Sequence, residues 1–216
     1  MMLKTVRMNR SWKDQTNPRV KRMKVGGAMP HILGERVMLR EYREEDFPAI
    51  RAWVNDPETT RYLSGAFLAP HTALQTEQYM QNILAGKADG YHFIVARRED
   101  GAYLGQIDFL FVHPVNRYAE LGMVLARAAE RGQGYGREAL SLMLGFGFES
   151  LNLHRVGLEV FAENERAVRC YEACGFVREG VLRAQEFSRG AYRDILRMAV
   201  LREEWEAHPH PRSGIR

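Results

Sequence analysis

The sequence predicts a mixed α/β domain in which helices flank a central, largely antiparallel sheet. Three observations support this fold class. Short segments of strand character follow one another through residues 91–125 and are separated by turn residues. Apolar residues at helical spacing then follow a glycine-rich segment at residues 131–136. A second helical segment starts at Asn164, between the strand-like residues 154–161 and a closing pair of strand-like segments.

The first elements of the domain are expected to be a strand and a helix. Residues 37–42 have strand character. Residues 44–53 suit a helix, because Phe47, Ile50 and Val54 recur at helical spacing and share one face. The Asn-Asp-Pro sequence that follows is typical of a helix end.

Two further helices are expected before the main strands. Residues 59–63 suit a short second helix, and residues 65–70 suit a loop. A third, amphipathic helix ends near Gly86. Its apolar face is formed by Leu74, Met80, Ile83 and Leu84.

Most strands of the sheet are expected after residue 90. Its predicted strands are residues 91–96, 103–112, 118–125 and 154–161. The helix that starts at Asn164 is expected to end at Gly175, since glycine is favoured just after a helix. Residues 176–181 and 192–200 suit a closing strand pair, with a loop at residues 188–190.

The positive charge of the chain is concentrated at its start. Residues 1–29 contain eight Lys and Arg against one Asp, a balance of +7, whereas the whole chain carries +4, so the remainder carries −3. We expect a disordered basic leader, or untranslated sequence upstream of the true start, followed by one domain at residues 30–206 and a loose tail at 207–216. Nucleic acid is expected to bind, if at all, through the leader.

Several protein classes are disfavoured by composition and spacing. No apolar run approaches the roughly 20 residues that a membrane helix needs, and no secretory h-region follows the basic leader. The two cysteines, Cys170 and Cys174, suit reduced thiols in a cytoplasmic protein. The seven histidines show no metal-ligand spacing, so neither a metal site nor a Ser/His/Asp triad is expected.

The glycine-rich segment Arg131-Gly132-Gln133-Gly134-Tyr135-Gly136 suggests a phosphate site. An apolar run, residues 121–125, precedes it, and a helical pattern follows it. A strand, a glycine loop and a helix start together present backbone N–H groups to an anion. The spacing matches neither the P-loop nor the dinucleotide fingerprint. From spacing alone, a tight strand-to-helix turn is an equally good interpretation.

Two ordered motifs resemble the GNAT superfamily of N-acetyltransferases. Arg131-x-x-Gly134-x-Gly136 is similar to the motif with which that family binds the pyrophosphate of acetyl-coenzyme A, and residues 164–176 are similar to its later helix and strand. The resemblance covers roughly residues 34–206 and is strongest to the bacterial spermidine and ribosomal-protein-alanine N-acetyltransferases. It implies the acyl-CoA N-acyltransferase fold, with acetyl-CoA as co-substrate in a V-shaped split between the fourth and fifth strands.

The resemblance also implies roles for individual residues. Tyr171 would be the acid that protonates the departing thiolate, although its helical face also suits a core aromatic residue. Asn164 would contact the pantetheine arm, although a helix N-cap explains it equally well. The backbone of a bulged strand would hold the pantetheine amides and the acetyl oxygen. The implied cofactor-binding residues are Met123, Val124, Leu125, Arg131, Gly132, Gln133, Gly134, Tyr135, Gly136 and Asn164.

Glu120 is the candidate base. An amine with a lysine-like pKa of about 10.4 must lose a proton before it attacks a thioester. Strand alternation places Glu120 on one face with Gly122 and Val124, and related acetyltransferases often use an acidic residue there through water. We give slightly more weight to a solvated carboxylate that pairs with Arg117 or another neighbour. The weaker substitutes for a base are Asp108 and Glu186.

The function that the resemblance implies is acetyl transfer to a primary amine by direct attack in a ternary complex. We lean slightly to a small, polyamine-like amine over a peptide N-terminus. The carboxylates that could hold its cations are Asp56, Glu58, Glu77, Asp108, Glu120 and Glu186. The alternatives are a protein N-terminal acetyltransferase, a non-catalytic coenzyme A-binding module and, more weakly, a protein that associates with RNA through its leader. A homodimer is left open.

Overall fold

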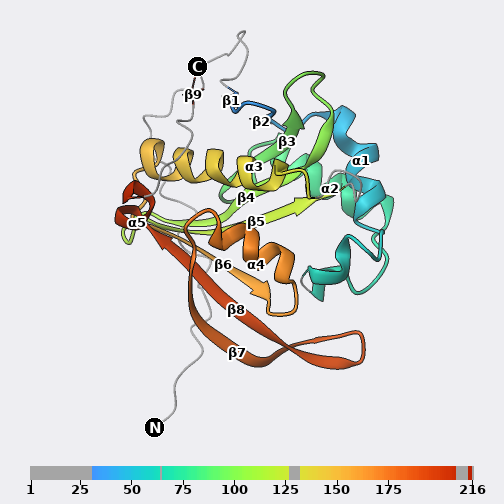
Figure 1. Ribbon diagram of the computed structural model, residues 1–216. Helices are drawn as coiled ribbons and strands as arrows, with labels where there is room; N and C mark the ends of the chain where they lie inside the picture. The colour runs from blue at the N-terminus through green and yellow to red at the C-terminus, as the bar shows by residue number, and fades with distance from the viewer. Residues whose placement is uncertain (1–30, 64, 127–131, 208–213, 216) are drawn as a thin grey trace.

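A computed structural model describes residues 31–63, 65–126, 132–207 and 214–215, so the predicted leader lies outside the described residues. The strands are β1 (Ile32–Leu33), β2 (Val37–Arg40), β3 (Tyr91–Arg97), β4 (Tyr103–His113), β5 (Tyr118–Leu125), β6 (Arg155–Phe161), β7 (Val177–Ser188), β8 (Ala191–Leu201) and β9 (Gly214–Ile215). The α-helices are α1 (Phe47–Trp53), α2 (Ala73–Leu84), α3 (Tyr135–Gly145), α4 (Glu165–Glu172) and α5 (Arg202–Ala207). Within the described residues the strands form one nine-stranded sheet in the order β7-β8-β6-β5-β4-β3-β2-β1-β9 (Figure 1).

The sheet is antiparallel except between β5 and β6, which confirms the predicted fold class. These two strands run parallel because α3 carries the chain across between them. They pair over three positions, from Tyr118 with Arg155 to Glu120 with Gly157. Beyond Glu120 each strand continues without pairing to the other, so the sheet splits there. The split lies one strand number later than expected because the short β1 precedes the predicted first strand.

Two apolar clusters lie on opposite faces of the sheet. The larger cluster packs α3, α4 and α5 against the sheet and includes Leu140, Met143 and Phe148. The smaller cluster packs α1 and α2 against the sheet and includes Ile50, Trp53 and Met80. In Figure 1, α3 and α4 lie in front of the sheet, while α1 and α2 lie at its right-hand side. Helices therefore cover both faces of the sheet.

The glycine segment leads into α3 as the apolar spacing predicts. Gly134 takes a left-handed conformation, with φ of 86°, at the position just before the helix. The last turn widens into a π-helix over Phe146–Ser150. Gly147, within this π-helix, packs closely on β4, because a Cβ atom there would lie 2.8 Å from Cζ of Phe109. The missing side chain thus allows the end of this helical segment to pack directly on β4.

Several elements differ from the expectation. β7 and β8 are 12 and 11 residues long and project past the sheet as a hairpin (Figure 1). Most residues of β7 are exposed, so the alternation that marks a half-buried strand is missing from the sequence. The predicted helix at residues 59–63 is a 3-10 turn, Thr60–Tyr62. Gly214–Ile215, within the end expected to be loose, pairs with β1.

The described residues have three further features. No helix among them is long and apolar enough to cross a membrane. They contain no cluster of His, Cys, Asp and Glu that could hold a metal ion. Cys170 and Cys174 are free thiols, each partly buried.

Candidate active site

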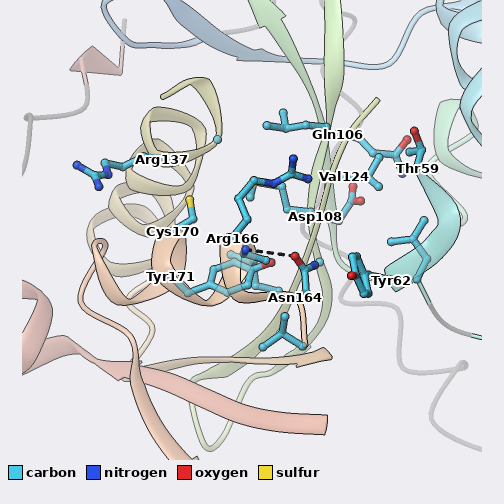
Figure 2. Close-up of a pocket in the computed structure, with 18 of the residues that line it drawn as sticks. Thr59, Tyr62, Gln106, Asp108, Val124, Arg137, Asn164, Arg166, Cys170 and Tyr171 are labelled. Carbon is cyan, nitrogen blue, oxygen red and sulfur yellow. Dashed lines mark hydrogen bonds between the residues drawn. The ribbon is translucent and has the colours of Figure 1, made fainter. Parts of the chain in front are cut away.

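A large cleft opens where β5 and β6 separate. It has a volume of about 2350 Å³ and is bordered by the glycine segment, α4, residues 58–63 and the β7–β8 hairpin. Typical small-molecule pockets hold roughly 300–1,000 Å³, so this cleft has room for two substrates at once. Figure 2 draws Arg137, Cys170 and Tyr171 on one side of it and Asp108, Thr59 and Tyr62 on the other.

The glycines of the predicted phosphate segment lie at the cleft. Gly132 and Gly134 both have positive φ, 81° and 86°, which favours glycine at each position. A Cβ atom on Gly136 would lie 3.1 Å from Cδ1 of Leu125, so a larger residue would fill the space beside the strand. Open backbone N–H groups at a helix start fit a pyrophosphate. Arg131 lies outside the described residues.

Gln133 and Tyr135 are turned toward Arg36, a residue that sequence reasoning missed. Arg36 donates from Nη1 to the carbonyl oxygen of Gln133 at 2.9 Å, and its guanidinium lies 5.1 Å from the centre of the Tyr135 ring. Glu138 accepts hydrogen bonds from the Arg36 side chain and from its backbone N–H. Arg36 also lines the cleft. Because about a hundred residues separate it from the glycine segment, no local pattern could reveal the contact.

The strand expected to hold the acetyl and pantetheine groups faces the split. Met123, Val124 and Leu125 all line the cleft. The bulge that we expected in this strand lies instead on its neighbour β4, where Leu110 has no partner between the pairs of Phe109 and Phe111. An extra residue on one strand bends the ladder locally, and this bend lies beside the point of the split. The edge of β5 beyond Glu120 is therefore open to the cleft.

Tyr171 lies on α4. Its ring is buried in the core, and the residue also lines the cleft. The residue is 7% exposed, and its ring packs against Phe176 at 5.7 Å. Within the described part of the chain its hydroxyl has no hydrogen-bond partner. Burial raises the pKa of Tyr171 well above its usual value, so the hydroxyl keeps its proton at neutral pH. The core interpretation is thus correct, and it leaves a protonated hydroxyl available to a ligand.

Asn164 is the N-cap of α4. Its Oδ1 accepts a hydrogen bond from the N–H of Ala167 at 3.3 Å (Figure 2). The residue also lines the cleft. The capping interpretation is confirmed, and the contact with pantetheine stays a prediction.

Glu120 lies at the point where β5 and β6 separate. Tyr118 donates its hydroxyl hydrogen to Oε1 of Glu120 at 2.8 Å, so the neighbouring partner is Tyr118 and not Arg117. Both carboxylate oxygens lie 3.6 Å from the position of a Cβ on Gly157. Burial, together with this carboxylate, raises the pKa of Tyr118 to about 12. Glu120 therefore lines the cleft with a neutral hydrogen-bond donor beside it.

A second polar cluster lies on the β4 wall of the cleft. Asp108 is 4% exposed, and its Oδ1 is 3.0 Å from Nδ1 of His92 and 3.5 Å from the hydroxyl of Tyr42. Gln106, two residues earlier, donates to the hydroxyl of Tyr79 at 3.0 Å. Burial raises the pKa of Asp108, and burial followed by the charge of Asp108 raises the pKa of Tyr79 to about 12. Of this cluster, only Asp108 could be identified from the sequence as a candidate site residue.

Comparison with known proteins identifies the family. The family profile described as "Acetyltransferase (GNAT) domain" matches residues 36–177, which include the glycine segment, the split and Tyr171. The chain belongs to the GNAT acetyltransferase family. An N-acetyltransferase of Bacillus licheniformis, p20, whose own name calls it uncharacterized, is 30% identical over 182 residues, 82% of this chain and 99% of the relative.

Two comparisons involve a named substrate. The spermidine N(1)-acetyltransferase of Vibrio cholerae is 35% identical over 102 residues, which cover 47% of this chain and 58% of that protein. The crystal structure of the spermidine N-acetyltransferase from Vibrio cholerae, in complex with CoA and spermine, superposes with a TM-score of 0.71 at 27% identity and covers 80% of this chain and 99% of that one. These likenesses confirm the predicted fold and show that the GNAT chain is an acetyl-CoA-dependent N-acetyltransferase.

Proposed function

We propose that this GNAT enzyme acetylates a small primary amine of the polyamine type by direct attack in a ternary complex. The observation that carries the proposal is the cleft at the β5–β6 split, which has Tyr171 on one wall and Glu120 at the point of separation. A cleft of this volume can hold acetyl-CoA and an amine together, as direct transfer requires.

Two residues are suited to the proton transfers of this reaction. The amine must lose a proton, and the Glu120 carboxylate lines the cleft where an acceptor can reach it, directly or through water. The departing sulfur needs a proton or a hydrogen bond, and Tyr171 keeps a buried, protonated hydroxyl at the cleft. We therefore assign Glu120 as the base and Tyr171 as the acid.

The proposed cofactor site joins three parts of the chain. Gly132, Gly134 and Gly136 would offer backbone N–H groups to the pyrophosphate. The open edge of β5 at Met123, Val124 and Leu125, together with the amide of Asn164, would hold the pantetheine arm. Arg36 adds a positive charge at the same loop and holds the Gln133 carbonyl away from the anion. Arg131, Gln133 and Tyr135 are the other residues of the glycine segment that we propose to bind the cofactor.

Charge and shape favour a small cationic acceptor. Of the six carboxylates proposed for a polyamine, four line the cleft: Glu58, Asp108, Glu120 and Glu186. Arg189, at the tip of the β7–β8 hairpin, donates to the carbonyl oxygen of Pro57 at 2.6 Å. This contact joins the hairpin to the segment at residues 57–63, so that side of the cleft is bridged. A bridged pocket that contains these carboxylates suits an amine better than the open groove that a peptide N-terminus needs.

An acceptor panel tests the proposal. Thiol release from acetyl-CoA is measured at low salt with spermidine, amino sugars, aminoglycosides and N-terminal peptides. We expect turnover with spermidine. Glu120→Gln should lower kcat/KM at neutral pH, and higher pH should restore it, because the free amine then needs no base. Glu206→Gln on α5 is the control for loss of a carboxylate. If only a peptide that begins with Ala or Ser is acetylated, a protein N-terminal acetyltransferase replaces the proposal.

A further inference from the structure

Gln106 presents an unpaired acceptor at the wall of the cleft. The residue is 8% exposed, lies on β4 and lines the cleft. Its Nε2 donates to the Tyr79 hydroxyl at 3.0 Å, but its Oε1 is buried and has no partner among the described residues. Burying an amide oxygen without a hydrogen-bond donor is unfavourable, so such atoms commonly face a ligand or water. A hydrogen-bond donor inside the cleft would therefore satisfy this oxygen.

Asp108 supplies negative charge next to that oxygen. The two side chains are two residues apart on β4 and so share one face of the strand. Oδ1 of Asp108 faces Nδ1 of His92 at 3.0 Å, and the other ring nitrogen of His92 faces the carbonyl oxygen of Asp89 at 2.8 Å. An imidazole with an oxygen acceptor at each nitrogen donates to both only when it is protonated. Asp108 thus brings its carboxylate to this wall, with His92 as its neighbour.

The position of the cluster relative to the proposed base is set by strand pairing. Gln106 pairs with Val124 and Asp108 with Gly122, across β4 and β5. Paired residues point to the same face, so both side chains lie on the face of Glu120. Glu120 is two residues from Gly122, which makes it a diagonal neighbour of Asp108 at about 7–8 Å between Cα atoms. Gly122 lies between them, and the Leu110 side chain packs over it, since a Cβ atom on Gly122 would lie 3.1 Å from Cδ1 of Leu110.

We propose that Gln106, Asp108 and Tyr79 form a subsite for a second, protonated nitrogen of the acceptor. An ammonium there donates to Oε1 of Gln106 and to the Tyr79 oxygen, and Asp108 balances its charge. The acetylated nitrogen then lies near Glu120, one short alkyl chain away. The preferred acceptors are therefore diamines and polyamines rather than monoamines. The inference rests on the proposed acetylation of small amines, and it assigns the residues that select among them.

Two acceptors of equal length test the subsite. Putrescine has two amines, and n-pentylamine carries a methyl group where putrescine has its second nitrogen. Thiol release is measured with each acceptor for the wild-type enzyme and for Gln106→Met, which conserves volume and removes the acceptor oxygen. Gln81→Met, on the exposed face of α2 outside the cleft, is the matched control. Calorimetric titration of putrescine into the enzyme–CoA complex gives a readout independent of turnover.

We expect Gln106→Met to raise the KM and the Kd for putrescine about tenfold, which is the usual size of a hydrogen bond to a charged group. Its kinetics with n-pentylamine should stay within about twofold of the wild-type values. Asp108→Asn should act in the same direction. If Gln106→Met raises the KM equally for both acceptors, or for neither, the subsite is overturned, while amine acetylation stays intact. If no small amine releases thiol although CoA binds, the proposed function fails, and the subsite fails with it.

Discussion

Nδ1 of His92 lies 3.0 Å from Oδ1 of Asp108, a carboxylate that is 4% exposed at the wall of the cleft. The second ring nitrogen of His92 lies 2.8 Å from the carbonyl oxygen of Asp89. The hydrogen bond to Asp108 raises the pKa of His92, and burial raises the pKa of Asp108. Both groups of the pair therefore have a higher pKa than they have in water, and a proton lies between them.

This pair should make the stability of the enzyme depend on pH. A raised His92 pKa means that the imidazolium stabilises the fold fully below about pH 6.5, and that this contribution is lost as pH rises through the folded-state pKa. The wild-type Tm should therefore fall by a few degrees relative to that of His92→Gln between about pH 6 and pH 9. Scanning calorimetry at several pH values measures the difference. His154→Gln, an exposed histidine, should keep the wild-type pH dependence. Parallel Tm curves for the wild type and His92→Gln would contradict the pairing.

Removing the Tyr171 hydroxyl should slow turnover without weakening cofactor binding. Tyr171→Phe keeps the packing against Phe176 and deletes the protonated group at the cleft. We expect kcat to fall about ten- to a thousandfold, which overlaps the usual range for acid catalysis, while the Kd for CoA stays unchanged. Thiol release and calorimetry measure the two quantities. Tyr192→Phe, on the exposed β7–β8 hairpin, is the control. Wild-type turnover in Tyr171→Phe would leave Tyr171 with a packing role alone.

Blocking the glycine segment should weaken cofactor binding. Gly134 has φ of 86°, and a Cβ atom there would lie 3.0 Å from Nη2 of Arg36. Gly134→Leu should therefore raise the Kd for CoA about tenfold or more, because the side chain displaces Arg36 and covers the loop N–H groups. Gly86→Leu is a matched control, since Gly86 also has positive φ but open space around it. Equal CoA affinities in the two variants would remove the phosphate assignment.

Local patterns predicted much of the fold and part of the site. The glycine segment, the Asn164 cap and the position of Tyr171 depend on spacings within one helix or turn, and the structure contains all of these elements. Arg36 and His92 could not be found in this way. Arg36 reaches the loop from a turn about a hundred residues earlier, and His92 meets Asp108 only because β3 and β4 pair in that register. Side chains brought together by strand register leave no periodic signal in a single sequence.

Chemical labelling of the two cysteines should locate the cofactor without any measurement of activity. Cys170 lines the cleft, and its sulfur lies 3.9 Å from the Cβ position of Gly136. The neighbouring thiol of Cys174, with the nearby charge of Arg137, lowers the pKa of Cys170, while the Cys170 thiol and burial raise the pKa of Cys174. Because the thiolate is the reactive form, iodoacetamide should alkylate Cys170 first at neutral pH.

Bound CoA should then protect Cys170, since an occupied glycine segment covers the path to its sulfur. Mass spectrometry of the peptide that contains both thiols gives the two rates, and fragmentation assigns them. We expect CoA at saturation to slow alkylation of Cys170 about tenfold or more, because only the free enzyme then reacts. Cys170→Ser should leave slow labelling of Cys174 that CoA hardly changes. Faster labelling of Cys174, or equal rates with and without CoA, would place the cofactor elsewhere than beside Gly136.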